Sequence, residues 1–431
     1  MQTIYRNLFA VSILWILITT TGWSQKLEIA TAPQAGGFSA ERLKVLDVRL
    51  NEWVEKGWMQ GGTILIARNG KIVYHKAVGY NDIEAKVLMK KDDIFRIASQ
   101  TKAITSVAIM QLFEQGKLLL DDPVSKYLPA FRKQQVLATF NEADTTYTTV
   151  PAKSEITIRQ LLTHTSGLGY AQIGSKEANA IYAKANLTAG IGVVGDDLLN
   201  AMNRLGKLPL MHQPGERWTY GLNTDLLGCL VEQLSGKTLD HYFKEHLFEP
   251  LGMKDTYFHI PAPKANRLVK LYREMPGEKL EKSAGNMLNG RTITPDYPLE
   301  GSTYYSGGAG LSSTIEDYAI FLQMLLNGGI YNGKRILGRN TVDMMITNQI
   351  GEVPYSNQDK FGLGFSIITD KSQGRTPANA GTFAWGGAFA TSYWVDPKEK
   401  MVYLFYRQLQ NTTKGEMVEK FRAMVYQAIQ D

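Results

Sequence analysis

The chain has 431 residues, of which 44% are hydrophobic and 20% are charged, and it contains 40 glycines. This composition is typical of a globular protein and excludes a disordered chain, a collagen-like chain and a repeat array. Because the length exceeds what one core usually supports, we expect either one large domain of two lobes or two domains.

The first 24 residues differ from the rest of the chain. Arg6 is their one charged residue, and the run from Leu8 to Ile18 is apolar except for Ser12. This run is shorter than the roughly 20 apolar residues that a membrane-spanning helix needs, so we expect no stable membrane span. We therefore predict a signal peptide over residues 1–24, cleaved after Ser24, and an exported chain that is periplasmic or extracellular.

The charged and metal-binding residue types exclude several kinds of partner. The net charge is +6, but the basic pair Lys90 and Lys91 is followed at once by Asp92 and Asp93, and no basic stripe interleaves with aromatic residues. We therefore expect no nucleic-acid partner. The chain has six histidines but no H-E-x-x-H motif and no cysteine cluster, so we expect no metal site and no cofactor. The single cysteine, Cys229, lies in an apolar run and is expected to be buried.

Strand patterns near both ends of the chain enclose a mostly helical middle. Near the N-terminus we predict a helix over residues 40–56 and a hairpin that turns at Asn69-Gly70, with the apolar run Thr63–Ala67 covered on both faces. The middle is mostly helical from Ile156 to about Leu251. The C-terminal part predicts a helix capped at Ser313 or Thr314, strands at residues 364–369, 391–396 and 401–407, and a closing helix over residues 414–430.

This order of elements predicts an α/β fold. We expect an antiparallel sheet built from both chain ends and flanked by helices, with an inserted, mostly helical lobe. Residues 25–431 would then form a single domain, in which residues 25–155 and 300–431 make the α/β lobe and residues 156–299 make the helical lobe. A cleft between two lobes is a common place for a ligand.

Ser99 and Lys102 stand at the start of an apolar helix that we predict over residues 96–116. Residues three apart on a helix face the same side, and burying a lysine is costly unless it is paired or neutral. A neutral amine can accept the proton of a hydroxyl, and a helix N-terminus favours the oxyanion that then develops. Ser99 is thus a candidate nucleophile and Lys102 its base, although an S-x-x-K quartet also occurs by chance on wet surfaces.

Several segments in the expected order resemble one known group of enzymes. They include "FRIASQTKAITSVAIMQLFEQGKLLLDDPVSKYLP", "ITIRQLLTHTSGL", "PGERWTYGLNTDLLG", "FEPLGMKDTYF", "SGGAGLSSTIEDYAIFLQMLLNGG" and "WGGAFATSYWVDP". The chain is similar to the serine β-lactamase and penicillin-recognising superfamily, in its class C β-lactamase-like branch. The resemblance implies a two-lobed α/β fold and catalysis through an acyl-enzyme on Ser99.

The second motif of that superfamily is a Tyr followed by x-Asn, and Tyr220 in "WTYGLN" occupies the position of the Tyr. By resemblance, the Tyr220 phenol contacts the nucleophile and passes protons to the leaving group. Leu222 replaces the Asn, and Asn223 comes one place late, so an apolar side chain stands where a polar group normally meets the substrate. Asp225 further on is similar to the esterase-type members, although Gly221 stands where they carry Ser.

The third motif, normally Lys/His-Thr/Ser-Gly, reads Trp385-Gly386-Gly387. By resemblance, the backbone N–H groups of Ser99 and Ala388 form the oxyanion hole, and any residue but Pro supplies such a donor. The group that binds a substrate carboxylate is replaced by an indole. This box is similar to that of the family VIII carboxylesterases and related acyltransferases.

We therefore expect a secreted serine hydrolase of small-molecule esters, a carboxylesterase, with Ser99, Lys102 and Tyr220 catalytic. Trp385, Gly386, Gly387, Leu222 and Asn223 would line the substrate site. The alternatives are a D-alanyl-D-alanine carboxypeptidase-like peptidase or weak β-lactamase, and a non-catalytic penicillin-binding-like sensor. His164 beside Ser166 is expected to be structural, since the chain has no G-x-S-x-G elbow, and Gly236-Lys237-Thr238 is expected to be a helix end.

Overall fold

The computed structural model describes residues 26–430 apart from residues 189, 278 and 286–292. The predicted signal peptide lies outside these residues. No helix among the described residues is both long and apolar enough to cross a membrane.

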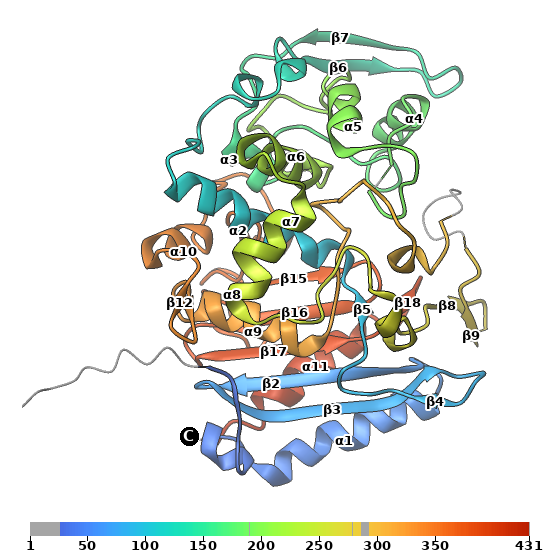
Figure 1. Ribbon diagram of the computed structural model, residues 1–431, viewed down its shortest axis with the longest axis vertical. Helices are drawn as coiled ribbons and strands as arrows, with labels where there is room; N and C mark the ends of the chain where they lie inside the picture. The colour runs from blue at the N-terminus through green and yellow to red at the C-terminus, as the bar shows by residue number, and fades with distance from the viewer. Residues whose placement is uncertain (1–25, 189, 278, 286–292, 431) are drawn as a thin grey trace, which may run out of the picture.

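A mixed sheet joins the two ends of the chain (Figure 1). Its central strands are β2 (Gly61–Arg68) and β17 (Met401–Tyr406), which pair antiparallel. The described strands follow the order β1 (Glu28–Ile29), β3 (Lys71–Asp82), β2, β17, β16 (Thr391–Asp396), β15 (Phe383–Gly387), β14 (Ser366–Ile367) and β13 (Lys360–Phe361), with β4 (Val87–Leu88) beside β3. Only β1 runs parallel to its neighbour among these pairs, so the expected antiparallel sheet built from both chain ends is confirmed.

The hairpin between β2 and β3 turns where the sequence predicts. Asn69 and Gly70 have φ values of 52° and 73°, the left-handed pair that a two-residue hairpin turn needs. Every residue of β2 is buried, because helices cover both faces of the sheet. On one face lie α1 (Ala40–Glu55) and α11 (Glu416–Tyr426), and on the other lies α9 (Ile315–Leu326).

The second lobe is mostly helical and packs on α2 (Thr101–Glu114), the helix between the two lobes (Figure 1). Its helices are α3 (Ile158–Leu162), α4 (Lys176–Lys184), α5 (Leu198–Leu205), α6 (Asn223–Ser235), α7 (Leu239–Phe243), a π-helical turn (Lys244–Phe248) and α8 (Glu249–Leu251). Outside the large sheet and this lobe lie α10 (Arg339–Met345) and three small sheets: β5 (Phe95–Arg96) with β10 (Ser312–Ser313), β11 (Ile330–Tyr331) with β12 (Lys334–Arg335), and β18 (Leu409–Gln410) with β8 (Tyr272–Met275) and β9 (Lys279–Lys282).

The helical lobe also contains a hairpin, β6 (Gln135–Phe140) with β7 (Tyr147–Pro151), which Figure 1 places at the far end from the large sheet. Val136 forms a parallel bridge with Leu210, so the hairpin hydrogen-bonds to this lobe. The boundary between the lobes therefore lies before this hairpin and not at residue 155. A two-stranded hairpin needs a partner surface to be stable, and the helical lobe supplies it.

Three predicted elements are clearly shorter than expected, one of them the closing helix, which spans Glu416–Tyr426 and not residues 414–430. The helix predicted over residues 96–116 is a strand, a 3-10 turn (Ala98–Gln100) and then α2, so the helix begins at Thr101. The strand predicted over residues 364–369 is only Ser366–Ile367, because Gly364 has a left-handed φ of 102° that ends the extended run.

Candidate active site

Ser99 lies in the 3-10 turn between β5 and α2, at the boundary of the two lobes. From Asp93 to Leu112 every residue except Ser99 is buried, so Ser99 is the one side chain of this segment that reaches the surface. The preceding residue, Ala98, has φ of 42°, a conformation that a residue with a side chain rarely adopts. Such strain concentrates at functional sites, where the surrounding structure enforces it.

Lys102 and Tyr220 both reach the Ser99 hydroxyl. The Tyr220 hydroxyl donates to Ser99 Oγ at 2.7 Å, and Lys102 Nζ lies 3.3 Å from the same oxygen. Lys102 is only 2% exposed, and its amine also contacts the Tyr170 hydroxyl at 2.9 Å and the Gly308 carbonyl at 2.7 Å. The structure thus brings together the three side chains predicted to be catalytic, and a proton on any of them has a hydrogen-bonded path to the others.

Tyr170 is a member of the site that sequence reasoning missed. It is buried in the loop after α3. Burial raises the pKa of its phenol well above the ordinary value, and the neighbouring Tyr220 and Asp225 raise it further. Tyr170 therefore keeps its proton and contacts the amine of Lys102 as a neutral group. The sequence holds no signal for it, because nothing in its local pattern relates residue 170 to residue 102.

Asp225 is a buried carboxyl group close to Gly308. It is 0% exposed, Ser306 Oγ donates to its Oδ1 at 2.6 Å, and burial raises its pKa to about 6 against the opposing charge of Lys102. A Cβ on Gly308 would lie 2.5 Å from Asp225 Oδ2 and 3.5 Å from Lys102 Nζ. Gly308 therefore cannot carry a side chain, because its Cβ would clash with the Asp225 carboxyl group.

Leu222 and Asn223, which we expected to line the substrate site, both lie in the interior. Leu222 is 0% exposed within the main hydrophobic core. Asn223 is also 0% exposed, and its amide contacts His164 Nδ1 at 2.9 Å and the hydroxyl of Ser166. This placement argues against a substrate contact for either residue, since an α-helix that starts one place after Leu222 rotates both side chains into the core.

His164 has the structural role expected of it. It is buried, and burial lowers its pKa well below the ordinary value, with the charge of Lys102 acting in the same direction. Its neutral ring packs 5.0 Å from the ring of Tyr220 and 5.7 Å from that of Trp218. His164 and Asn223 thus support the rings that position the Tyr220 hydroxyl.

The end of β15 lies directly against the turn that carries Ser99. A Cβ on Gly387 would be 2.3 Å from the carbonyl oxygen of Ile97, so only glycine permits this approach. Ala388 follows at once, is exposed, and its N–H donates to no backbone carbonyl among the described residues. Ala388 thus directly follows the glycine that contacts the turn of Ser99, where the resemblance leads us to expect the second oxyanion donor.

Trp385 belongs to a group of aromatic rings beside Tyr220. Its indole is half-buried, 5.7 Å from the ring of Tyr220, 5.4 Å from that of Phe361 and 6.5 Å from that of Trp218. Tyr355 closes the group at 4.9 Å from Trp218. The wall of the site next to Tyr220 is thus apolar and aromatic, although Gly386 between Trp385 and Gly387 has no side chain to contribute.

Other residues singled out by the sequence lie outside the chemistry. Cys229 is buried, which raises the pKa of its thiol to about 12. Gly236 ends α6 in a left-handed conformation with φ of 71°, as a helix end does. Within the part of the chain that the structure describes, no three His, Cys, Asp or Glu side chains are grouped to hold a metal ion.

Comparison with known proteins identifies the family. The family model described as Beta-lactamase matches residues 46–427, and the chain belongs to this family. It is 31% identical over 361 residues to the esterase EstB of Burkholderia gladioli, covering 81% of this chain and 86% of EstB. It is 28% identical over 432 residues to a putative D-alanyl-D-alanine carboxypeptidase of Escherichia coli K12, covering 92% and 89% of the two chains.

A solved structure supports the same class. That of EstCE1, described as a hydrolase with promiscuous acyltransferase activity, matches with a TM-score of 0.76 and 28% identity over 90% of this chain and 98% of EstCE1. The expected fold and superfamily are therefore confirmed, and the protein is a serine hydrolase of the β-lactamase fold with esterase relatives.

Proposed function

We propose that this protein is an exported carboxylesterase that acts through an acyl-enzyme on Ser99. The observation that carries the proposal is the position of Trp385. Its indole lies 5.7 Å from the ring of Tyr220, on the strand where related enzymes that bind carboxylated substrates hold a cation or hydroxyl. An apolar wall favours an uncharged acyl or alcohol group over the carboxylate of a peptide or β-lactam. The relationship to EstB, an esterase, supports the same reading.

The geometry supports a two-step reaction. Ser99 Oγ attacks the acyl carbonyl carbon while its proton passes to the pair of Tyr220 and Lys102, which both hydrogen-bond to this oxygen. The backbone N–H groups of Ser99 and Ala388 stabilise the oxyanion. Tyr220 then protonates the departing alkoxide, which leaves as the alcohol. A water molecule attacks the acyl-enzyme, gives up its proton to the same pair, and releases the acid and the free Ser99 hydroxyl.

The test compares three substrates on the mature chain and its Ser99→Ala variant. The substrates are p-nitrophenyl butyrate, a D-alanyl-D-alanine peptide and nitrocefin, followed by a kinetic trace and by intact-protein mass. We expect turnover of the ester, weak reaction with the other two, and a loss of kcat of at least roughly 1,000-fold in Ser99→Ala. Ser372→Ala is the matched control, because Ser372 is a buried serine that bonds to Thr369 and should keep activity within a few fold.

The alternatives give different results. The relationship to the putative carboxypeptidase of E. coli favours a D-peptidase as the second candidate. Faster turnover of the D-peptide than of the ester would select it and reject our interpretation of Trp385. A lasting adduct on Ser99 with no turnover would instead make the protein a binding protein. Export is tested separately, by N-terminal sequencing of the secreted or periplasmic chain, where Gln25 should be the first residue.

A further inference from the structure

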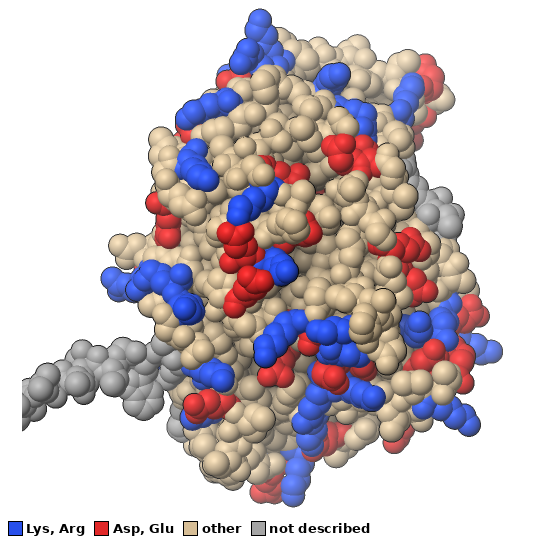
Figure 2. All heavy atoms as spheres, in the orientation of Figure 1, with Lys and Arg blue, Asp and Glu red and all other residues tan. Residues whose placement is uncertain are grey.

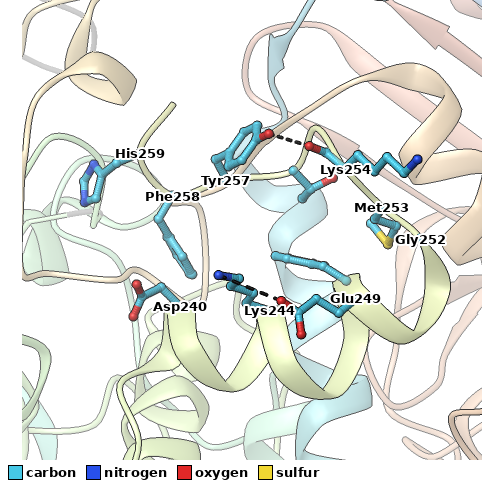
Figure 3. A pocket seen from close by; sticks show the side chains of 11 residues that line it. Asp240, Lys244, Glu249, Gly252, Met253, Lys254, Tyr257, Phe258 and His259 are labelled. Atoms are coloured by element: carbon cyan, nitrogen blue, oxygen red, sulfur yellow. Dashed lines mark hydrogen bonds and ion pairs between the residues drawn. The ribbon is translucent and has the colours of Figure 1, made fainter. Parts of the chain in front are cut away.

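A cavity of about 550 Å³ lies outside the catalytic site, between the helical segment from α7 to α8 and the loop that follows it (Figure 3). This volume falls in the range of small-molecule sites, about 300–1,000 Å³. Its lining consists of Asp240, Lys244, Phe248, Glu249, Gly252, Met253, Lys254, Thr256, Tyr257, Phe258 and His259. None of the catalytic side chains is among them.

The interior of the cavity is apolar and largely aromatic. Phe248, Met253 and Phe258 are each at most 6% exposed and form its buried lining. Phe258 points into the cavity from the loop, opposite the helix that carries Lys244 (Figure 3). The ring of Phe243 stacks on Phe258 at 5.7 Å and 18°, which holds it in place. Aromatic walls of this kind favour a flat ring as the occupant.

The charges at the mouth of the cavity balance. Lys244 Nζ lies 3.8 Å from Glu249 Oε1, and Asp240 and Lys254 add one charge of each sign. Acidic and basic side chains lie side by side on the surface over α7 and α8 (Figure 2). An anion or a cation would therefore meet repulsion as well as attraction here and would also have to lose its hydration. An uncharged ring has no charge to be repelled or desolvated.

One wall of the cavity is connected to the catalytic residues. A Cβ on Gly310 would lie 2.7 Å from two ring carbons of Phe258, so the glycine backbone rests directly on this ring. Gly310 is two residues from Gly308, whose carbonyl contacts Lys102 Nζ at 2.7 Å. The next residue along the wall, Tyr257, exchanges two 2.8 Å backbone hydrogen bonds with Ser312.

The second connection leads to the nucleophile. Ser312 in β10 pairs with Arg96 in β5, three residues before Ser99. A shift of the segment Thr256–Phe258 is therefore transmitted both to the carbonyl that holds Lys102 and to the strand that leads to Ser99. Packed contacts of this kind carry energetic coupling between two sites, and such coupling acts equally in both directions for binding.

We propose that this cavity is a second ligand site, which takes one small uncharged aromatic molecule and changes the rate of the Ser99 reaction through Phe258 and Gly310. The binding part of the proposal is independent of the proposed function. The effect on rate rests on the proposed esterase activity.

Binding is tested by calorimetry with 2-naphthol on the mature chain. We expect one site with Kd of about 1 mM or tighter, the same Kd in Ser99→Ala, and binding at least tenfold weaker in Met253→Trp, which fills the cavity. Leu88→Trp is the control, because Leu88 is 64% exposed and outside the lining. Phe258→Leu, which removes the ring but keeps an apolar side chain, should also weaken binding and serves if Met253→Trp does not fold. The proposal is overturned if 2-naphthol does not bind the wild type, or if it binds Met253→Trp and Phe258→Leu as tightly as it binds the wild type.

The effect on rate is tested with p-nitrophenyl butyrate at increasing 2-naphthol. We expect kcat to change at least twofold in the wild type and in Leu88→Trp, and to stay constant in Met253→Trp. A rise in KM that persists in Met253→Trp, with kcat constant and with affinity for 2-naphthol unchanged in that variant, would mean that 2-naphthol binds only at Ser99, and it would overturn the inference. Binding without any change in kcat overturns the coupling alone. If no ester is hydrolysed while 2-naphthol still binds, the proposed function fails and the second site stands.

Discussion

Lys102 is enclosed by two tyrosine rings as well as by its three hydrogen-bond partners. Its Nζ lies 4.7 Å from the centroid of the Tyr220 ring and 5.5 Å from that of Tyr170. The face of an aromatic ring attracts a cation. The hydroxyls of the two tyrosines have different partners: that of Tyr220 bonds to Ser99, and that of Tyr170 bonds to the amine of Lys102. The two tyrosines therefore have different tasks: one reaches the nucleophile and the other positions the lysine.

Replacing Tyr170 with Phe tests this division. The change removes the hydroxyl 2.9 Å from Lys102 Nζ but keeps the ring. We expect kcat for p-nitrophenyl butyrate to fall about tenfold, which corresponds to about 1.4 kcal/mol of activation free energy, with little change in KM. The control is Tyr182→Phe, since the Tyr182 hydroxyl accepts a bond from the Gly169 N–H in the same lobe. Equal losses in the two variants would mean that Tyr170 acts only through the fold.

Asp225 makes stability depend on pH. Burial raises its pKa from the usual 3.8 to about 6, so between these values the folded protein keeps a proton that the unfolded chain releases. The contribution of this group to the free energy of unfolding is therefore present at pH 4 and is lost as the pH rises to 6. A shift of this size corresponds to roughly 3 kcal/mol.

Asp225→Asn should abolish this contribution. Asn cannot ionise and keeps an oxygen that accepts from Ser306. We expect the stability of the wild type, measured by urea unfolding at pH 4, 5, 6 and 7, to fall relative to that of the variant across this range. Asp343→Asn, at an exposed position, should follow the wild type. Parallel curves for Asp225→Asn and the wild type would show that the carboxyl is ionised in the folded protein.

At the scale of elements, the site depends on how closely β15 approaches the turn that carries Ser99. Gly387 lies against the Ile97 carbonyl, and Gly386 and Gly387 together leave this end of the strand without side chains. The strand can therefore bring the Ala388 N–H beside the nucleophile. Catalytic donors must be held to within fractions of an ångström, so a small displacement of β15 has a large effect on rate.

Gly387→Ala should separate this strand from the turn. The new Cβ would meet the Ile97 carbonyl oxygen at 2.3 Å, so β15 must move. We expect kcat to fall by roughly 100-fold, the cost of misplacing one oxyanion donor, while circular dichroism stays unchanged. Gly301→Ala is the control, because a Cβ there meets nothing within 4 Å. Full activity in Gly387→Ala would show that the Ala388 N–H is not an oxyanion donor.

At the scale of the whole molecule, the two ends of the chain hold each other in place. Phe421 of α11 packs 5.0 Å from Phe405 of β17, and both belong to a core with Trp53 of α1. This core lies under the sheet, on the face away from the catalytic residues (Figure 1). Substitutions there should change stability without changing the chemistry.

Phe421→Ala is expected to lower the free energy of unfolding by about 3–5 kcal/mol, because Phe421 is 0% exposed and its removal leaves a cavity. We expect kcat at 25 °C to stay within twofold of the wild type in the fraction that is folded. The urea midpoint and the activity per folded molecule check both statements. A selective loss of kcat would instead show that the lower core is coupled to the site.

Local sequence patterns were enough to predict much of the secondary structure and the three side chains that meet around the Ser99 hydroxyl. Asn69-Gly70 strongly favours a tight hairpin turn. The strands Thr391–Asp396 and Met401–Tyr406 could be predicted because alternation and apolar runs are local properties. Ser99 and Lys102 were recognisable because three residues of helical spacing bring them together. Tyr220 followed from a motif that resembles one in a known family.

The tertiary structure alone decided which other residues meet at that site. Tyr170 and Gly308 contact Lys102 from 68 and 206 residues away, and no local pattern encodes such a distance. The same packing turned Leu222 and Asn223 into the interior, although their position beside Tyr220 had suggested a contact with substrate. The physical reason is that a helix start or a loop path is set by what packs against it, and the sequence shows only neighbours along the chain.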